Sequence, residues 1–251
     1  MIDRVAADLL PVDLICIPNG LERLGSRISE AKQYADDLQE DGSWADVDYA
    51  DRTGSANGYF WSPYHHLHRM MAMAYAYNKP DNEAYQNADV LAALNKALVF
   101  WGQRKPSTTN WWENDIGKGM AMGRISVMMK GKLSEEAMSV ALGHNGTDVD
   151  PVGANGAWRT QNYLYRMLAT DNYDGIRRGL DAMTQTLSVD YIGTSQESVQ
   201  VDSSFWCHGN VLYSEGYGMA LANSAAVWFK YAADTPFAIG EEALKSRSEE
   251  H

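Results

Sequence analysis

Cysteine is scarce in this 251-residue chain, which contains only Cys16 and Cys207. The two lie far apart and lack the short spacings of structural metal sites, so one disulfide and two free thiols both remain open. Long apolar runs are also missing. Pro11, Asp13 and Pro18 interrupt the apolar residues among the first twenty, which excludes a membrane span or a signal-peptide apolar segment there.

Positive charge is in short supply as well. Lysine and arginine number 21 against 33 aspartates and glutamates, which gives a formal net charge of −12. This balance argues against a general surface for nucleic acid or for an anionic membrane. Because no stretch resembles a linker, we expect residues 1–251 to form a single domain without a β-sandwich domain.

Alternation of apolar and polar residues, the pattern of a half-buried strand, is limited to a short possibility at residues 198–201. Apolar positions instead recur at three- and four-residue steps, as in helices with one buried face. The predicted helices cover about residues 21–38, 63–77, 88–101, 120–129, 134–142, 158–168, 175–187 and 217–231. We therefore expect an all-α fold, an (α/α) toroid or incomplete barrel of helical hairpins, with the long loops at one end.

Aromatic residues, in contrast, are plentiful. The chain has 8 Trp and 14 Tyr, more than a core needs, which suggests a cleft lined with rings of the kind that binds carbohydrate. An aromatic-rich core is the plainer alternative. The methionine-rich runs are most simply interpreted as core.

The densest group of chemically active side chains lies at residues 202–218. His208 and Tyr217 can both transfer protons, and Gly216 and Gly218 flank the tyrosine, so the backbone can bend there and admit a ligand. We interpret this stretch as the candidate catalytic centre. Taken alone, the two side chains would more often be structural.

Four strings of residues occur in a fixed order along the chain: Trp61-Ser-Pro-Tyr-His-His66-Leu-His-Arg69, Asn110-Trp-Trp-Glu-Asn-Asp-Ile-Gly117, Gly153-Ala-Asn155, and the stretch from Asp202 to Gly218. Together they resemble polysaccharide lyase family 8, which includes hyaluronate, chondroitin AC and xanthan lyases. The resemblance extends from about Asp41 to Tyr231. Each string alone is a moderate signal, and their order makes the resemblance specific.

The resemblance implies an enzyme that cleaves a uronic-acid-containing polysaccharide by β-elimination, without a cofactor or metal, and that is secreted or periplasmic. It implies an anionic polysaccharide as the partner, and neither nucleic acid nor a membrane. By carry-over, Asn155 would neutralise the substrate carboxylate, and His208 and Tyr217 would serve the proton transfers. The residues expected to contact the sugar chain are Trp111, Trp112, Asn110, Arg159, Arg69 and His66.

A β-elimination reaction requires a carboxylate-binding group, a base and an acid, whichever enzyme performs it. A proton beside a charged carboxylate is a weak acid, so a donor such as the Asn155 amide must stabilise the enolate-like anion that develops. A base must then remove the C5 proton, and an acid must protonate the departing O4. Tyr217 could do both in a syn elimination if its pKa of about 10 were lowered or the transfer were concerted, whereas an anti course would favour His208 as the base.

One departure from the family pattern keeps other functions open. Family members continue into further helices that carry an active-site arginine, whereas this chain ends at His251, so we expect either a shortened chain or a substitute among Arg159, Arg166 and Arg69. A non-catalytic polysaccharide-binding fragment is one alternative. A glycoside hydrolase on a helical barrel is another, and its acidic pairs would come from Glu113, Asp115, Asp202 and Glu215.

Metal binding is not expected. His65 and His68 lie one helical turn apart, but no acidic or cysteine partner follows at a suitable spacing. Cys207 stands next to His208, and we discount a thiol nucleophile there, because neighbouring side chains on one backbone rarely face each other.

Overall fold

The structure is a computed structural model, and it describes residues 1–9, 28–53, 61–190, 197–209 and 211–239. The chain divides into two compact units. Val5–Asn145 form the unit that we call the N-terminal unit. Met1–Arg4 and Gly146–His251 form the C-terminal unit. The prediction of a single domain over residues 1–251 stays a prediction.

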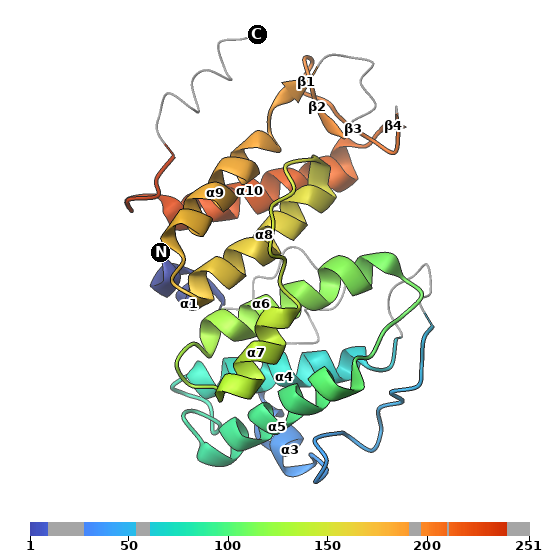
Figure 1. The fold of residues 1–251 in the computed structure, drawn as a ribbon, viewed down its shortest axis with the longest axis vertical. Coiled ribbons are helices and arrows are strands. Elements are labelled where there is room, and N and C mark those ends of the chain that lie inside the picture. Colours follow the sequence, from blue (N-terminus) through green and yellow to red (C-terminus); the bar gives the residue numbers. More distant parts are fainter. Residues whose placement is uncertain (10–27, 54–60, 191–196, 210, 240–251) are drawn as a thin grey trace. The chain divides into compact units, whose positions relative to one another are not determined.

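The N-terminal unit is built from helices that pack in antiparallel pairs. Figure 1 shows α4, α5, α6 and α7 lying side by side, and α4 and α5, α4 and α6, and α5 and α7 make the most extensive contacts. Its helices after α1 (Ile2–Leu9) are α3 (Ala31–Asp36), α4 (Tyr64–Asn78), α5 (Ala88–Arg104), the π-helix η1 (Glu113–Gly117), α6 (Lys118–Met128) and α7 (Glu135–Gly143).

The core of this unit surrounds α6, in which every residue from Lys118 to Met128 is buried. A helix that is covered on all sides belongs to a core rather than a surface. Methionine fills much of the space around it, because its unbranched side chain adapts to irregular gaps. The interpretation of the methionine runs as core is confirmed by the buried side chains of Met70, Met71, Met73, Met120 and Met122.

Polar caps begin two of these helices where the sequence predicts a start. The Ser134 side chain accepts a hydrogen bond from Ala137 N–H and starts α7, and Asn87 accepts from two N–H groups at the start of α5. Helix α5 ends at Arg104, and the C-cap residue that follows, Lys105, has a left-handed φ of 48°. Of the predicted helix 21–38, the structure describes residues 28–38, in which a turn at 29–30 precedes α3 (Ala31–Asp36). Residues 21–27 lie outside the described ranges.

In its described residues, the C-terminal unit combines three α-helices after Gly146 with a small sheet and a π-helix. Helix α8 (Gly153–Ala169) and α9 (Tyr173–Gln185) form a hairpin, and α10 (Met219–Ala232) packs on both (Figure 1). Gly179 permits the close approach of α8 and α9, because a Cβ there would lie 2.5 Å from a Leu164 methyl carbon. Between α9 and α10 come β1 (Val189–Asp190), β2 (Ser198–Gln200), β3 (Phe205–Cys207), β4 (Val211–Leu212) and the π-helix η2 (Ser214–Gly218).

Three sequence predictions about this unit are wrong in detail. The chain forms a four-stranded sheet, whereas the sequence suggested one short strand, because strands of two or three residues are too short to show a period. Helix α8 begins at Gly153, five residues before the predicted start, so Asn155 lies in a helix and not in a loop. Tyr217 belongs to a π-helix that precedes α10, not to the first turn of an α-helix.

The prediction of an all-α fold of paired helices is confirmed apart from this small sheet. Within the described ranges, no helix combines the length and apolar character that crossing a membrane requires.

Candidate acid–base site

The β2–β3 hairpin brings an acidic residue opposite a thiol. Ser198 pairs with Trp206 and Val199 with Phe205 in antiparallel register. One step outward, the same register places Glu197 across from Cys207, and opposed residues project to the same face of a sheet. The turn is held by Asp202, whose Oδ1 accepts hydrogen bonds from Ser204 N at 3.0 Å and Ser204 Oγ at 2.6 Å.

His208 follows directly in the turn between β3 and β4. Its φ is 49°, a left-handed conformation that is uncommon outside glycine, and Gly209 continues with a φ of 85°. This backbone turns the imidazole toward its neighbour. One ligand atom each from Glu197, Cys207 and His208 lies within 4.8 Å of the others, and Nδ1 of His208 is 3.9 Å from Oε1 of Glu197.

The expectation that the side chains of Cys207 and His208 would diverge is therefore wrong. Adjacent side chains diverge on an extended strand, but the strand ends at Cys207 and His208 has left-handed backbone geometry. Cys207 is a buried free thiol within the described residues, and Cys16, the other half of the disulfide alternative, lies outside them. Burial, and then the charge of Glu197, raise the pKa of this thiol.

Tyr217 packs its ring against three other aromatic rings. The His208 imidazole meets it edge to face at 5.3 Å between ring centroids, the Tyr213 ring lies at 5.5 Å and the Trp158 ring at 6.0 Å. The π-helix that carries it is closed by a hydrogen bond of 3.2 Å from Gly218 N to Tyr213 O, five residues back. π-Helical turns are rare and often occur at functional sites.

The two glycines beside Tyr217 have a different purpose from the one expected. A Cβ on Gly216 would lie 2.7 Å from the Tyr213 ring, and one on Gly218 would lie 2.8 Å from Cβ of Phe205. The glycines thus admit side chains of the protein itself, and these fix the position of the π-turn. They do not provide open space for a ligand.

The surroundings of Tyr217 favour its protonated form. Partial burial raises the pKa of the phenol, and the negative charge of Glu197, followed by Cys207 and Tyr213, raises it further. An ordinary phenol already titrates near 10, so Tyr217 holds its proton at neutral pH. The resting side chain can donate a proton to a leaving group. It can act as a base only after that proton has been removed.

Asn155 lies in the first turn of α8, between Gly153, which packs on Glu197, and Trp158, which contacts Tyr217. Gly153, with a φ of 62°, packs so closely on Glu197 that a Cβ there would lie 2.5 Å from Oε2. Trp158, three residues after Asn155 and therefore on the same side of the helix, contacts Tyr217. The Asn155 Oδ1 is buried, and no hydrogen-bond partner for it occurs among the described residues. Since amide oxygen and nitrogen differ little in shape, a half-turn of this amide presents a donor instead.

Arg159, on the same helix, is already paired with a carboxylate. Its Nη1 lies 2.9 Å from Oδ2 of Asp150, whose other oxygen accepts a hydrogen bond from Val152 N at 3.1 Å. The pair is partly exposed, with Arg159 at 40% side-chain exposure, so a polyanion could compete for the guanidinium. Arg166 lies in the last turn of α8.

In the N-terminal unit, the two adjacent tryptophans differ in exposure. Trp111 is 52% exposed, whereas Trp112 is half-buried beside Gly117. Asn110 starts this helical segment by accepting a hydrogen bond from Trp112 N at 3.0 Å. Asn110 thus has a capping role, and Trp111 offers the more accessible aromatic surface for a sugar.

His66 and Arg69, both predicted to contact substrate, have structural partners. His66 is fully buried, with Nδ1 2.9 Å from Tyr49 Oη and Nε2 3.0 Å from Ala97 O, and burial lowers its pKa to about 3. Arg69 forms a two-pronged ion pair with Asp46, at 2.7 and 2.5 Å, while its guanidinium covers the Trp44 ring. We therefore leave both out of the candidate site.

Comparison with protein-family models gives a match to the N-terminal alpha-helical domain of polysaccharide lyase family 8 over residues 21–249. The chain belongs to polysaccharide lyase family 8. Its residues are 28% identical over 221 positions to a chondroitinase-AC of Pedobacter heparinus, a match that covers 85% of this chain and 30% of that protein.

Solved family 8 structures share the fold. A chondroitinase AC lyase studied with bound oligosaccharides superposes with a TM-score of 0.80 at 26% identity, covering 99% of this chain and 35% of that chain. A chondroitin AC lyase from Streptomyces coelicolor gives 0.71 at 18% identity over 97% and 34%, and a Paenibacillus xanthan lyase gives 0.67 at 18% over 99% and 25%. The chain thus spans about a third or less of these relatives.

Within the C-terminal unit, two of the segments that carry predicted site residues lie together. The structure brings His208 and Tyr217 into contact, and α8 supplies Asn155 beside the residues that touch them. Sequence reasoning missed Glu197. Glu197 and Cys207 each lie five residues from Asp202, so a hairpin turn centred on Asp202 pairs them. The sequence alone does not show that the turn lies there, and the pairing could not be predicted without it.

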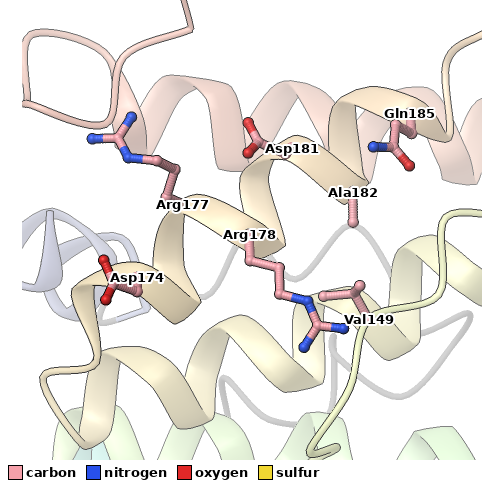
Figure 2. Close-up of a pocket in the computed structure, with 7 residues that line it drawn as sticks. All are labelled: Val149, Asp174, Arg177, Arg178, Asp181, Ala182 and Gln185. Carbon is pink, nitrogen blue, oxygen red and sulfur yellow. The ribbon is translucent and has the colours of Figure 1, made fainter.

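A separate hollow lies along α9 and is lined by Val149, Asp174, Arg177, Arg178, Asp181, Ala182 and Gln185 (Figure 2). The two arginine side chains that line this hollow already have partners within the protein. Arg178 forms an ion pair with Asp148, and Arg177 Nη2 donates a hydrogen bond of 3.1 Å to Pro236 O. It shares no lining residue with the group around His208 and Tyr217. We assign it no part in the acid–base site.

Proposed function

We propose that this chain is a polysaccharide lyase domain that cleaves uronic-acid-containing polysaccharides by β-elimination, leaving an unsaturated uronate end. The observation that carries the proposal is the contact between His208 and Tyr217, at 5.3 Å between ring centroids. Two groups that transfer protons, nine residues apart in sequence, are held together by a hairpin turn and a π-turn. A purely structural pair would need neither an exposed imidazole nor a phenol.

The proposed reaction uses three side chains of the C-terminal unit. The Asn155 amide binds the uronate carboxylate and stabilises the anion that forms when the C5 proton leaves. The electron pair then forms the C4–C5 double bond, the C4–O4 bond breaks, and a proton is delivered to O4. His208 and Tyr217 carry the proton between C5 and O4.

The contact between the two rings favours a syn course. Groups that touch each other reach one face of a bound sugar, whereas an anti course needs acid and base on opposite faces. Tyr217 holds its proton at rest, because burial and the charge of Glu197 raise its pKa. Before it can serve as the base, its proton must pass to an acceptor, and the neighbouring His208 imidazole fills that role.

Chondroitin is the first substrate to test, because the matched relative from Pedobacter heparinus is a chondroitinase-AC. Exposed Trp111 provides an aromatic surface on which a sugar ring can lie, and Arg159 provides a cation for a carboxylate or sulfate. Local cations must offset the unfavourable net charge of −12. Because chondroitin is a polymer, its cleavage by this chain also implies that the protein acts outside the cytoplasm.

A non-catalytic polysaccharide-binding fragment is the second candidate, favoured by the exposed Trp111 ring, which can bind a sugar without catalysis. The hydrolase alternative has less support. Asp202 is used in a hairpin turn, and the Glu113 carboxyl is buried, which leaves two of its four proposed acids unsuited to flank a glycosidic bond.

The decisive experiment incubates the purified chain with hyaluronan, chondroitin, xanthan, glucuronan and alginate while ultraviolet absorbance is followed. Elimination creates an unsaturated uronate that absorbs, and hydrolysis does not. Rising absorbance with any of these polymers supports the lyase. Binding of a polymer without any rise rejects catalysis by this chain and favours the binding fragment.

A further inference from the structure

We propose that Glu197, Cys207 and His208 form a binding site for a divalent transition-metal ion of the zinc type, and that its occupation switches off the acid–base pair. One ligand atom from each residue lies within 4.8 Å of the other two. The three side chains are a carboxylate, a thiol and an imidazole, which are the ligand types that Zn²⁺ takes in proteins.

The spacing suits a tetrahedral ion. Zinc bonds of about 2.0–2.3 Å place ligand atoms roughly 3.3–3.8 Å apart around the metal. Nδ1 of His208 and Oε1 of Glu197 are already 3.9 Å apart. Rotations of the Glu197 and His208 side chains must bring the three ligand atoms, now within 4.8 Å of one another, to this spacing, and both side chains are less confined than the buried Cys207.

Backbone geometry of two independent kinds builds the cluster. The strand register sets Glu197 opposite Cys207, and the left-handed conformation of His208 turns its imidazole back toward Cys207. Gly153 then supports Glu197 from behind, since even a Cβ at that position would overlap the carboxylate. Three ligand groups held in place by separate contacts distinguish this cluster from acidic residues gathered on a surface.

The ligand set selects the metal. A thiolate and an imidazole favour Zn²⁺ and similar ions, whereas Mg²⁺ and Ca²⁺ prefer sites made only of oxygen. On binding, the Cys207 thiol releases its proton to solvent and the sulfur forms the metal bond. Three protein ligands leave a fourth position for water, and His208, with 60% of its side chain exposed, is the side from which an ion would enter.

Metal binding is expected to inhibit the proposed lyase, because the metal bond uses the lone pair of His208 Nδ1. Once Nδ1 of His208 binds a metal, the imidazole can no longer exchange a proton through that nitrogen. The metal bond also fixes the orientation of the ring beside Tyr217. The metal form is therefore expected to be inactive. This part alone depends on the proposed function, whereas metal binding does not.

Binding is tested first by titrating the full chain with Co²⁺, a zinc substitute whose bond to a thiolate produces a charge-transfer absorption. We expect one ion per chain with this absorption, displaced by ZnCl2, and no heat of binding in calorimetry with Mg²⁺ or Ca²⁺. Cys207→Ser should abolish the absorption and weaken zinc binding by at least ~100-fold, since even outer-shell partners of a metal are worth about 10–100-fold. Glu197→Gln should also weaken binding.

Cys16→Ser, which removes the other thiol of the chain, is the matched control and should keep the absorption. The proposal is overturned if no thiolate absorption develops, or if it disappears in Cys16→Ser and persists in Cys207→Ser. Circular dichroism of Cys207→Ser and of Cys207→Ala verifies that each variant is folded, so either can carry the test. If the lyase is active, zinc should inhibit the parent and spare Cys207→Ser.

Discussion

The imidazole of His208 meets the phenol ring of Tyr217 edge to face, at an angle of 82° between the ring planes. The first ring stands on a hairpin turn with a left-handed backbone, and the second stands on a π-turn. Both are uncommon backbone geometries, which persist only where their surroundings stabilise them. Their combination at one contact is the strongest structural sign that this pair has a chemical purpose.

Replacing Tyr217 by phenylalanine keeps the ring contacts and removes the hydroxyl group. We expect kcat on the polymer that the chain cleaves to fall about 10²- to 10⁴-fold, because positioned proton transfer is lost, while binding of the polymer is retained. Absorbance assays and binding measured on the same samples test this. Tyr173→Phe is the control, since Tyr173 is 65% exposed on α9 and should leave kcat unchanged. Full activity of Tyr217→Phe would remove this residue from the mechanism.

Asn155 should matter for its neutral amide. Asn155→Ala removes a donor and is expected to reduce kcat/KM about 10²- to 10³-fold. Aspartate has nearly the same shape as asparagine but adds a charge that repels the substrate carboxylate. Above pH 6, Asn155→Asp should therefore lose more kcat/KM than Asn155→Ala. Thermal melting of both variants controls for folding. If Asn155→Asp matches the parent in activity, Asn155 does not bind the carboxylate.

Gly153 and Gly131 form a matched pair for testing the position of Glu197. Both have a positive φ, of 62° and 72°, so alanine is strained at either position by about 1–2 kcal/mol. A Cβ meets nothing within 4 Å at Gly131, whereas at Gly153 it overlaps Glu197. We therefore expect Gly153→Ala to melt at a lower temperature than Gly131→Ala and to lose more lyase activity. Equal melting temperatures would show that Glu197 moves aside freely.

Glu113 makes the N-terminal unit sensitive to pH. Burial raises the pKa of its carboxyl to about 7, and the charge of Lys118 only partly opposes this. The unfolded chain loses the proton near pH 4.5 and the folded chain keeps it to about 7, so stability falls as pH rises through that window. Above it, ionised Glu113 costs about 3 kcal/mol.

Glu113→Gln should therefore be more stable than the parent at pH 8, by about 2–3 kcal/mol, and nearly equal to it at pH 4.5. Denaturant unfolding at both values measures the difference. Glu83→Gln, at an exposed glutamate, is the control for the loss of a carboxylate at the surface. A stability gain that is equal at pH 4.5 and pH 8 would contradict the assignment of the buried carboxyl.

Trp111 is expected to contribute to binding and not to proton transfer. Trp111→Ala removes a half-exposed ring and should raise KM about three- to tenfold with kcat nearly unchanged, because ring contacts are worth about 0.5–1.5 kcal/mol. Tyr85→Ala, at another exposed aromatic residue of the same unit, is the control and should leave KM unchanged. A fall in kcat with an unchanged KM would assign Trp111 a different role.

The sequence by itself determined the helices, the family and the two side chains at the centre of the proposed chemistry. A buried helix face repeats every three to four residues, and residues such as Pro63 and Ser134 mark helix starts, so α4, α5, α7 and α9 could be located from the sequence. The order of the four strings along the chain identified the family. These features are local, or they are fixed by the order of residues along the chain.

Only the tertiary structure decided how the site is assembled. Glu197 reaches His208 because a strand register sets it opposite Cys207, and no local pattern reports a register. The π-turn at Tyr217 depends on Phe205 and Tyr213 occupying the space beside two glycines. His66, which looks accessible in a polar string, is buried because the helix that carries it packs against α5. Contacts between distant residues set these positions, so the sequence could not predict them.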